Sequence, residues 1–583
     1  MTASPRADAE YASQVTERPT SLVELRVLDG PNLYFPRPAV KLTLDLTGLV
    51  ELSEPEARDL ACRLGLSTAR PGGPATAFRQ RFAARAVARL VRMVAAASGT
   101  TRLAVRARPA GDVSRLVIAF PWRHRGKAQA LGHAVADVLD ALPGTDVDRA
   151  VVESAAAVRA SEPGERPGTV RPHVPVVAVT GTNGKTTTSR MVAHIGRLAG
   201  LVVGWSNTDG IWVDGELVEA GDYSGPSGAR RVLADPRVDL AVTETARGGI
   251  LLRGMGTTHN DVSVVTNISA DHLGLHGVDT LDQLAEVKAV VTRVTRPEGW
   301  CVVNGEDPRT FAMRLTSPAR PWVFARDPEA PAVRAALTEG GRATTVLEGW
   351  ITVLEPDADP DPLVRVVDVP MTLAGLSRPN LENALAAASA ALAADLPRTA
   401  VVAGLQGFRP GPEHNPGRMN VYSVPVPGGA ATVLLDLAHN EAGLEALLEA
   451  MAGLRAPGAS LRLALGTAGD RQDEVLTVLG ELAAKSSDDV VVVHKSDYLR
   501  GRDPAELDAL YRVGAAAVGV HTLPSYGSEL AGYRALLDRA LPGDVVAVMC
   551  HQDRDAIEDD LRGRGAGIDD PDTLRAKALA AMR

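Results

Sequence analysis

The sequence predicts an α/β protein of several domains, built around a parallel β-sheet that is covered by helices. Two observations lead to this fold class. At 583 residues the chain is too long for a single hydrophobic core. From residue 174 onward, apolar runs of strand length alternate with helical segments, which is the pattern of parallel strands joined by helices. Because 45% of the residues are hydrophobic and 23% are charged, packed cores are expected throughout.

Charge and composition exclude several classes of function. The net charge of −9 provides no basic field to neutralise nucleic-acid phosphates, so no nucleic-acid partner is expected. Cys62, Cys301 and Cys550 are too far apart for a disulfide framework or a closely spaced zinc site, which favours a reducing cytoplasmic location. No apolar run reaches the roughly 18 residues of a membrane span, and no membrane partner is expected. Residues 1–20 are typical of a disordered leader, neither signal peptide nor anchor.

The first predicted domain covers residues 21–160 and is a small α+β domain. The strand-like runs LVELRVL, KLTLDL and RLVIAF alternate with the helical stretches AFRQRFAARAVARLVRMVAAA and KAQALGHAVADVLDAL. Residues 161–173 follow, rich in proline, glycine and charge and without periodicity. They indicate an interdomain linker.

Two further domains follow the linker. Residues 174–415 contain the runs VPVVAVT, DLAVTET, VSVVTNI and GWCVVNG, which predict the central parallel-sheet domain. The segment GFRPGPEHNPGR, dense in proline and glycine, marks the change to a last domain over residues 416–583. There TVLLDLAH, LRLALG, DVVVVHK and DVVAVMC alternate with helices, as in a smaller Rossmann-like unit.

The central domain begins with a phosphate-binding loop (P-loop). VPVVAVT, GTNGKTTT and SRMVAHIGRLAG represent a buried strand, a glycine-rich turn and an amphipathic helix. Gly181 and Gly184 let backbone N–H groups approach phosphate oxygens, Lys185 reaches the terminal phosphates, and Thr186 can ligate Mg²⁺. The common spacing requires glycine at position 179, where this chain has valine. A turn without catalytic meaning is the alternative, and the flanking strand, helix and Lys-Thr pair argue against it.

Further motifs in the same order resemble the Mur ligase family, whose members form peptide-like amides through an acyl phosphate. TNGKTTT resembles that family's nucleotide loop, and VTETARGGIL, TNISADHLGLHG, LAEVKAVV, VVNGEDP, RPNLENALAA, NPGRMNVY and LLDLAHNEAGLEAL resemble its later motifs. The resemblance implies an ATP-dependent carboxylate-amine ligase that releases ADP and phosphate and uses Mg²⁺. It also implies that the nucleotide loop comprises Gly181, Thr182, Asn183, Gly184, Lys185, Thr186 and Thr187.

The resemblance assigns a metal to four side chains. Thr186, Glu244 and His272 match positions that hold Mg²⁺ in the family, and Lys288 matches a lysine that many members carry as a carbamate able to bind a second ion. Glu244 and His272 follow strand-like runs, at the edge where α/β sheets place their ligands. Taken alone, Glu244 could cap a helix, His272 could be a hydrogen-bonded loop histidine, and Lys288 could be a solvated charge. Order and spacing together favour the metal site.

Other motif positions fall where the family contacts the base, ribose or phosphates of the nucleotide. They are Asn304, Arg418, Asp436 and His439. Arg418 is the strongest, because a planar guanidinium can bridge ATP and a developing acyl phosphate. We therefore expect Lys185, Glu244, His272, Lys288 and Arg418 to form the catalytic group. For the motif positions outside this catalytic group, an ordinary polar residue in a turn is the alternative.

Within this family, phrases over roughly residues 174–555 resemble the arginine-adding half of the cyanophycin synthetases. They include SNTDGIWVDGELVEAGDYSGPSGARRVL, TETARGGILLRGMG, GTAGDRQDE, KSDYLRGRDPAE and CHQDRD, and the block beginning ELRVLDGPNLYFPRPAVKLTLDL resembles the leading domain of those enzymes. The ATP-grasp domain that would stand between the two is missing, so one ATP site is expected. Arg247, Arg253 and residues 224–230 lie on the substrate side and would suit an acidic acceptor.

The expected substrates are an amino acid or other amine and an acidic acceptor carboxylate, with aspartate-containing acceptors as one candidate. Two alternatives stay open. The chain could be a Mur-type ligase for a folate, cell-wall peptide or natural-product carboxylate, or a non-catalytic nucleotide-binding scaffold for a separate ATP-grasp ligase. A basic cluster at Arg123, His124, Arg125 and Lys127 could dock an anionic chain, although a helix N-terminal flank explains it as well. Homo-oligomerisation is left open.

Overall fold

The computed structural model describes residues 21–66, 70–142, 146–271 and 273–581. Contacts divide the chain into two compact units, Met1–Gly168 and Thr169–Arg583. The division falls inside the stretch 161–173 that the sequence predicts as a linker. The leader predicted over residues 1–20 lies outside the described residues.

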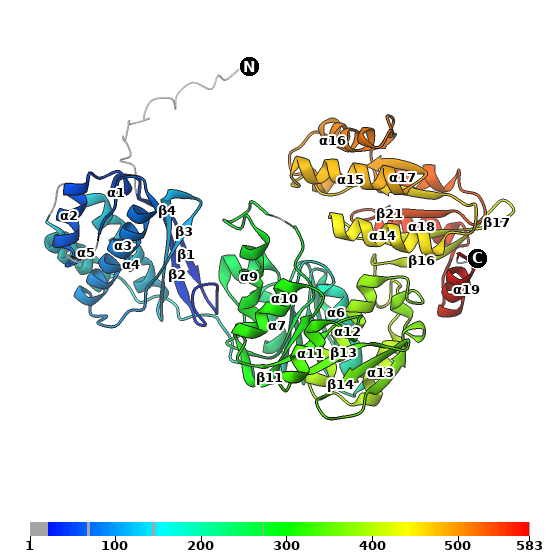
Figure 1. The fold of residues 1–583 in the computed structure, drawn as a ribbon, viewed down its shortest axis with the longest axis horizontal. Coiled ribbons are helices and arrows are strands. Elements are labelled where there is room, and N and C mark those ends of the chain that lie inside the picture. The colour runs from blue at the N-terminus through cyan, green and yellow to red at the C-terminus, as the bar shows by residue number, and fades with distance from the viewer. Residues whose placement is uncertain (1–20, 67–69, 143–145, 272, 582–583) are drawn as a thin grey trace, which may run out of the picture. The chain divides into compact units, whose positions relative to one another are not determined.

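The first unit is a four-stranded antiparallel sheet with helices on one face, in the strand order β1-β2-β4-β3 (Figure 1). Alternate residues of the second strand, Val40, Leu42 and Leu44, are fully buried against these helices, as expected for a sheet with one covered face. The strands are Leu22–Leu28 (β1), Ala39–Asp45 (β2), Arg106–Ala110 (β3) and Asp112–Pro121 (β4). The helices are Thr47–Val50 (α1), Glu54–Arg63 (α2), Ala77–Ala97 (α3), Arg125–Ala141 (α4) and Val147–Ala160 (α5).

The second unit begins with an eleven-stranded mixed sheet, in the order β15-β14-β13-β12-β11-β10-β5-β9-β6-β7-β8. Its seven central strands are parallel: Val176–Thr180 (β5), Val203–Ser206 (β6), Leu240–Glu244 (β9), Asn260–Val265 (β10), Thr295–Asn304 (β11), Arg320–Phe324 (β12) and Arg342–Leu347 (β13). Two antiparallel strands extend each edge: Gly210–Val213 (β7), Glu216–Ala220 (β8), Trp350–Leu354 (β14) and Asp361–Arg365 (β15).

Helices cover this central sheet (Figure 1). They are Lys185–Leu198 (α6), Pro226–Ala234 (α7), Arg247–Arg253 (α8), Leu281–Arg293 (α9), Pro308–Ala312 (α10), Pro331–Thr338 (α11), Arg378–Ala393 (α12) and Arg398–Gly407 (α13). Helix α6 ends where Gly200 takes a left-handed conformation (φ 84°), with the Leu201 N–H bonded back to the Gly196 carbonyl at 3.2 Å. Helix α12 is rich in buried alanine, which lets it pack closely on α6.

A second, seven-stranded sheet follows in the order β20-β19-β18-β21-β17-β16-β22. Its core strands are parallel and its β16 edge is antiparallel. The strands are Asn420–Val426 (β16), Gly429–Asp436 (β17), Leu461–Leu465 (β18), Asp489–Val493 (β19), Ser525–Tyr526 (β20), Val545–Met549 (β21) and Gly567–Ile568 (β22).

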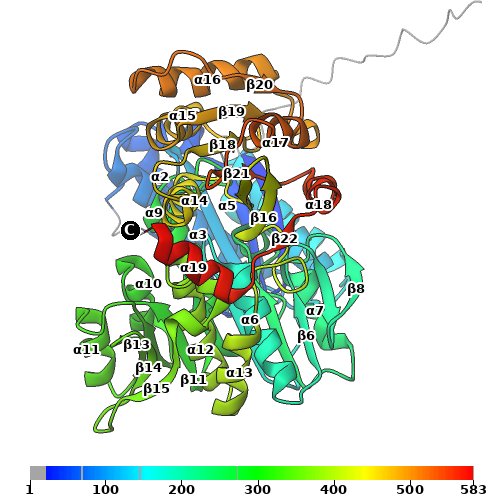
Figure 2. The same cartoon turned by 90° about the vertical axis from the view of Figure 1, so that its right-hand side faces the viewer.

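Helices pack on both faces of the second sheet. They are Glu441–Leu454 (α14), Asp473–Ser486 (α15), Pro504–Ala517 (α16), Glu529–Leu537 (α17), Arg554–Gly563 (α18) and Pro571–Ala581 (α19). Along β21, Val545 and Ala547 face the cluster that contains α14 and α15, whereas Val546 and Val548 face the cluster of α17 and α18. Helix α19 returns to pack against α14 (Figure 2).

The predicted fold class is confirmed, with one correction. The central sheet is mixed instead of purely parallel, because its edges end in the hairpin strands β7–β8 and β14–β15. Such edge strands close a parallel sheet without further crossover helices. The division of the second unit at residues 415 and 416 stays a prediction. Within the described part of the chain, no helix combines the length and apolar character that crossing a membrane requires.

Candidate functional site

The glycine-rich turn lies between the central strand β5 and helix α6, at the carboxyl edge of the parallel strands. Gly181 has φ 148° and Gly184 has φ 85°, values that side chains rarely tolerate. A Cβ atom at Gly181 would stand 1.8 Å from Thr266 Oγ1, and one at Gly184 would stand 2.1 Å from Asn383 Oδ1. Both glycines are therefore required by close packing as well as by backbone conformation.

The segment after β10 holds the turn in place. The backbone N–H groups of Thr182 and Asn183 donate to the carbonyl and side-chain oxygens of Asn267, at 2.9 and 3.0 Å. Thr266 Oγ1 donates to the Asn183 carbonyl at 2.6 Å. Lys185 Nζ lies back over the turn and donates to the Thr182 carbonyl at 2.8 Å. The turn is thus a preorganised cradle of the kind that binds phosphate at a helix N-terminus.

Glu244, at the end of β9, places a fully buried carboxylate beside this turn. Its Oε2 accepts a 2.8 Å hydrogen bond from Thr186 Oγ1, and its Oε1 lies 4.0 Å from Lys185 Nζ. Oε1 has no hydrogen-bond partner among the described residues. A buried carboxylate oxygen without a hydrogen bond is unfavourable unless a cation compensates its charge. The arrangement therefore fits a metal ion next to Thr186 and Glu244.

Lys288 reaches the same turn from helix α9. Its Nζ is buried and donates to the Gly181 carbonyl at 2.6 Å. Burial lowers the pKa of Lys288 far below its ordinary value; the Lys185 and Arg247 cations lower it further, against the opposing effect of Asp271 and Glu244. Burial therefore shifts Lys288 toward the neutral amine, away from the charged form that a solvated lysine would have.

Residues of the second sheet complete the site. Arg418 Nη2 donates to Thr186 Oγ1 at 3.2 Å, and the side chain of Asn440 exchanges hydrogen bonds with that of Asn183 at 3.1 and 3.3 Å. Arg471 Nη1 donates to Asp271 Oδ1 at 2.7 Å. Two segments separated by some two hundred residues in sequence thus meet at the phosphate loop.

A cavity of about 280 Å³ lies between these segments. The P-loop residues Asn183, Gly184 and Thr187 line it together with Arg418, Asp436 and His439. Asn380 and Asn383 of helix α12 line it as well. The cavity adjoins the phosphate cradle and is framed by polar groups, as expected for a nucleoside site.

Burial perturbs the titratable groups of this cavity. It raises the pKa of Asp436 to about 6, although the Met419 backbone N–H donates to its carboxylate at 2.8 Å. Burial lowers the pKa of His439 to about 4, so this imidazole is neutral at physiological pH. Burial also raises the pKa of Glu382, another lining residue, to about 7. Such shifts are typical of ligand-binding sites.

One of the predicted site residues stands apart from this group. Asn304 does not line the cavity but lies behind it, donating to the Thr266 carbonyl at 2.9 Å and to Glu382 Oε2 at 3.3 Å. His272 lies outside the described residues. Among the described residues, no group of three His, Cys, Asp or Glu side chains could hold a metal ion. A site with few protein ligands is typical of Mg²⁺ that also binds phosphates and water.

Sequence reasoning missed a buried cluster in the second sheet. Lys495 Nζ donates to the Gly466 carbonyl at 2.6 Å and lies 3.4 Å from Glu529 Oε1 and 2.5 Å from His551 Nδ1. Burial lowers the pKa of Lys495 to about 8. The His551 ring lies 6.2 Å from that of His439, so the cluster adjoins the nucleotide cavity. The phrases GTAGDRQDE, KSDYLRGRDPAE and CHQDRD contain Gly466, Lys495 and His551, and they follow the neighbouring strands β18, β19 and β21.

Two residues of the basic cluster of the first unit, Arg125 and Lys127, have structural partners. Arg125 Nη2 pairs with Asp29 Oδ1 at 2.9 Å, and Lys127 Nζ donates to the carbonyls of Val158 and Arg159 at 3.0 and 2.8 Å. Lys127 therefore caps the C-terminus of α5. These contacts favour the helix-flank interpretation over docking of an anionic chain.

Comparisons with known proteins identify the family of this chain. The family model described as Mur ligase middle domain matches residues 179–391, and the one described as Mur ligase, glutamate ligase domain matches residues 417–551. UDP-N-acetylmuramyl-tripeptide synthetase of Deinococcus radiodurans is 30% identical over 454 residues, covering 74% of this chain and 83% of that protein. The chain therefore belongs to the Mur ligase family of ATP-dependent ligases that form amide bonds.

Within the family, the chain is similar to cyanophycin synthetase. The enzyme of Trichormus variabilis is 39% identical over 346 residues, which is 59% of this chain but only 37% of that protein. The chain thus matches little more than a third of the length of this relative. Among solved structures, Escherichia coli FolC in complex with DHPP and ADP shares the fold, with a TM-score of 0.50 and 19% identity over 68% of this chain and 90% of that one.

The packing of Gly184 predicts how the phosphate loop responds to substitution. We expect Gly184→Ala to weaken ATP binding by at least about tenfold, because the added methyl group collides with Asn383 at a left-handed backbone position. Isothermal titration calorimetry measures the change. Gly200→Ala is the matched control, since Gly200 is also left-handed (φ 84°) but has open space around its Cβ position. Equal losses of affinity in both variants would contradict this explanation.

The raised pKa of Asp436 leads us to expect that nucleotide binding depends on pH. Protonation removes the charge of its carboxylate and part of its capacity to accept hydrogen bonds, and its pKa is raised from 3.8 to about 6, so this acceptor weakens as pH falls through 6. We expect the KM for ATP to rise roughly fourfold between about pH 7.5 and about pH 5.5, as the ionised fraction falls. Steady-state kinetics of Asp436→Asn should lack this step. A step of the same size in the variant would assign the dependence to another group.

Proposed function

We propose that this chain joins an amino acid or other amine to an acidic acceptor carboxylate, converting ATP to ADP and phosphate through an acyl-phosphate intermediate. The observation that carries the proposal is the convergence at Thr186. Its hydroxyl contacts Glu244 from the central sheet at 2.8 Å and Arg418 from the second sheet at 3.2 Å. Anionic, hydroxyl and cationic groups thus meet where the cradle would place the terminal phosphates.

Each of these residues has a chemical role in the proposed reaction. A carboxylate is a poor electrophile until one oxygen becomes a leaving group. An oxygen of the acceptor attacks the γ-phosphorus, the bond to the ADP oxygen breaks, and ADP leaves with its electron pair. The amine then attacks the acyl carbon, phosphate departs, and the amine loses a proton. Lys185 and Arg418 stabilise the charge that develops on the transferred phosphoryl group.

Mg²⁺ is the proposed metal, and the residues present fit it. Thr186 and Glu244 are the described side chains that would hold it, with His272 as a further predicted ligand; the ion would neutralise phosphate charge. The hydrogen-bond-free Oε1 of Glu244 supports this assignment. Asp436 and His439 remain the proposed contacts to the nucleoside, and Asn304 supports them from behind through Glu382.

The region proposed to bind the acceptor, residues 224–230 and helix α8, supports an acidic substrate. Residues 224–230 and helix α8 lie next to each other, and the Ala246 N–H donates to the Ser224 carbonyl at 2.8 Å. Arg247 and Arg253 bring two cations to this region. Cations there would suit a carboxylate-rich acceptor. The similarity to the arginine-adding half of cyanophycin synthetase makes arginine the first amine to test and aspartate-containing peptides the first acceptors.

The partial match to cyanophycin synthetase leads to a proposal about a partner protein. Because the chain matches little more than a third of cyanophycin synthetase, we propose that backbone extension, where it occurs, is supplied by a separate ATP-grasp ligase. A purely scaffolding chain is the alternative. The combination of Lys185, Glu244 and a buried Lys288 supports catalysis. A scaffold would not require a buried lysine with a strongly lowered pKa at this place.

A substrate-dependence assay tests the ligase. We expect ADP release to require both an acceptor carboxylate and an amine, screened with arginine first against short aspartate-containing peptides. Lys185→Ala should reduce the rate by roughly a hundredfold or more, since it removes charge stabilisation of the transferred phosphoryl group. The exposed Lys485→Ala serves as the control. Release with neither substrate would indicate a simple ATPase, and no release with any acceptor or amine would favour the scaffold.

Lys288 is proposed to act as a carbamate. The lowered pKa shifts its amine toward the unprotonated form, which is the form that reacts with CO₂. The resulting anion would replace a cation beside Lys185 and could approach a metal ion, which a protonated amine cannot. We expect Lys288→Ala and bicarbonate-free buffer each to lower activity at least about tenfold, and short carboxylic acids to restore activity partly in the variant. Normal activity under both conditions would exclude the carbamate.

A further inference from the structure

A second cavity, of about 110 Å³, lies along the C-terminal half of helix α6. It shares no lining residue with the nucleotide cavity. Three elements enclose it: the C-terminal half of α6, the hairpin of β6 and β7, and residues 408–416, which join the two sheets of the second unit. None of the residues assigned to the ligase reaction lines it.

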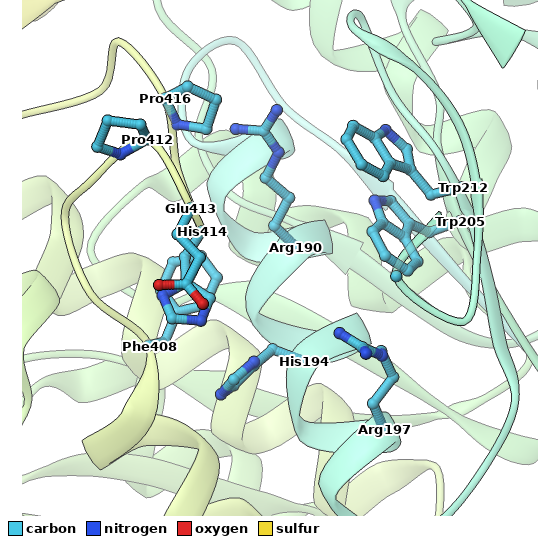
Figure 3. A pocket seen from close by; sticks show the side chains of 11 residues that line it. Arg190, His194, Arg197, Trp205, Trp212, Phe408, Pro412, Glu413, His414 and Pro416 are labelled. Carbon is cyan, nitrogen blue, oxygen red and sulfur yellow. The ribbon is translucent and has the colours of Figure 1, made fainter. Parts of the chain in front are cut away.

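Two aromatic walls face each other across this cavity, as Figure 3 shows. Trp205 and Trp212 are directly paired across β6 and β7, and their rings are parallel within 2° at a centroid distance of 5.6 Å. On the opposite side, Phe408 and His414 lie 5.4 Å apart, and the ring of His194 lies 4.9 Å from that of His414. Aromatic side chains on two sides of a small cavity suit a flat ligand, which can stack on them.

The aromatic walls carry polar groups without partners. Trp205 is 8% exposed, and its Nε1 has no hydrogen-bond partner among the described residues. The same holds for Nε1 of Trp212 and Nε2 of His194. An indole nitrogen can only donate, and buried donors are nearly always paired in native proteins. The two indoles therefore require an acceptor that the described part of the chain does not supply.

Two arginines are the cationic groups that line the cavity, and each is paired with an aspartate that does not line it. Arg190 is 6% exposed and is held in place by Asp209 Oδ2 at 2.6 Å and Asn415 Oδ1 at 3.2 Å. Arg197 is half-exposed, with Asp214 3.5 Å away. Burial lowers the pKa of His194 to about 4, so His194 adds no charge at neutral pH. Two guanidinium groups thus line the cavity against one exposed carboxylate, that of Glu413.

We propose that this cavity binds a small planar carboxylate, with its ring between the paired indoles and the Phe408–His414 wall, and its carboxylate oxygens accepting from the indole N–H groups and an arginine. The volume is close to the roughly 150 Å³ that hold one benzene ring in a closed cavity, and this cavity is open on one side. The inference does not depend on the ligase reaction.

Binding there would involve the segment between the two sheets. Asn415 fastens this segment to α6 through Arg190 and through Thr187 Oγ1, at 3.2 and 3.3 Å. A ligand in contact with His414 and Phe408 would hold the same segment from its other side. A ligand in this cavity would therefore contact the segment that leads to Arg418 without entering the nucleotide cavity.

Benzoate is the probe for this site, measured by isothermal titration calorimetry on the full chain. We expect binding that persists with a saturating non-hydrolysable ATP analogue present, and weaker binding of the neutral benzamide. Trp212→Phe, which keeps the ring but removes the N–H, and Arg197→Gln should each weaken benzoate binding by roughly fivefold or more, the effect of losing one hydrogen bond. Trp350→Phe and Arg334→Gln, at exposed positions elsewhere in the unit, should leave it unchanged.

Two further outcomes separate this site from the ligase site. Lys185→Ala should lose ATP turnover and keep benzoate binding, whereas Trp212→Phe should keep ATP turnover. Loss of benzoate binding in Lys185→Ala, or competition with the ATP analogue, would place the carboxylate in the reaction site and overturn the proposal. Absence of binding to the folded wild-type chain, or equal affinity of all variants, would overturn it as well.

Discussion

The carboxylate of Glu244 is the group on which the arrangement of the site depends. It has no exposed surface, one hydrogen bond from Thr186 and an ion-pair contact of 4.0 Å to Lys185. A carboxylate in such surroundings is costly unless positive charge lies close to it. Strand β9 places Glu244 there because β9 and β5 are neighbours in the parallel sheet. The same adjacency that builds the sheet therefore creates the electrostatic requirement for a cation at the phosphate loop.

Three basic side chains lie near this carboxylate, and they differ in their origin and in their tendency to carry charge. Lys185 remains near Glu244, Arg418 arrives from the second sheet, and Lys288 is driven toward its neutral form by burial and by the other cations. Three protonated groups so close together would repel one another in a region of low dielectric constant. A neutral Lys288 lowers that repulsion. It also prepares the amine for the chemistry proposed for it, so the electrostatics of the fold and the proposed reaction are consistent.

Much of the fold and part of the site could be predicted from sequence because the signals are local. The run VPVVAVT with GTNGKTTT contains a whole strand, turn and helix start, and β5, the turn and α6 follow it closely. The same holds for helix α3, whose predicted bounds agree with the structure. The antiparallel edges were not predicted, because strands such as β8 and β15 are short and mostly exposed and so lack a clear apolar pattern. Asn304 was assigned to the nucleotide by motif, yet its amide faces Thr266 and Glu382.

By itself, the sequence determined the phosphate loop, the parallel core of the central sheet, and the resemblance to ATP-dependent ligases, because these depend on neighbouring residues in order. Only the tertiary structure decided that Arg418 meets Thr186, that Arg471 pairs with Asp271, and that Trp205 and Trp212 form one wall of a separate cavity. These contacts join segments from different strands and sheets. Their distances depend on how whole elements pack, and a local pattern of residue types does not contain that information.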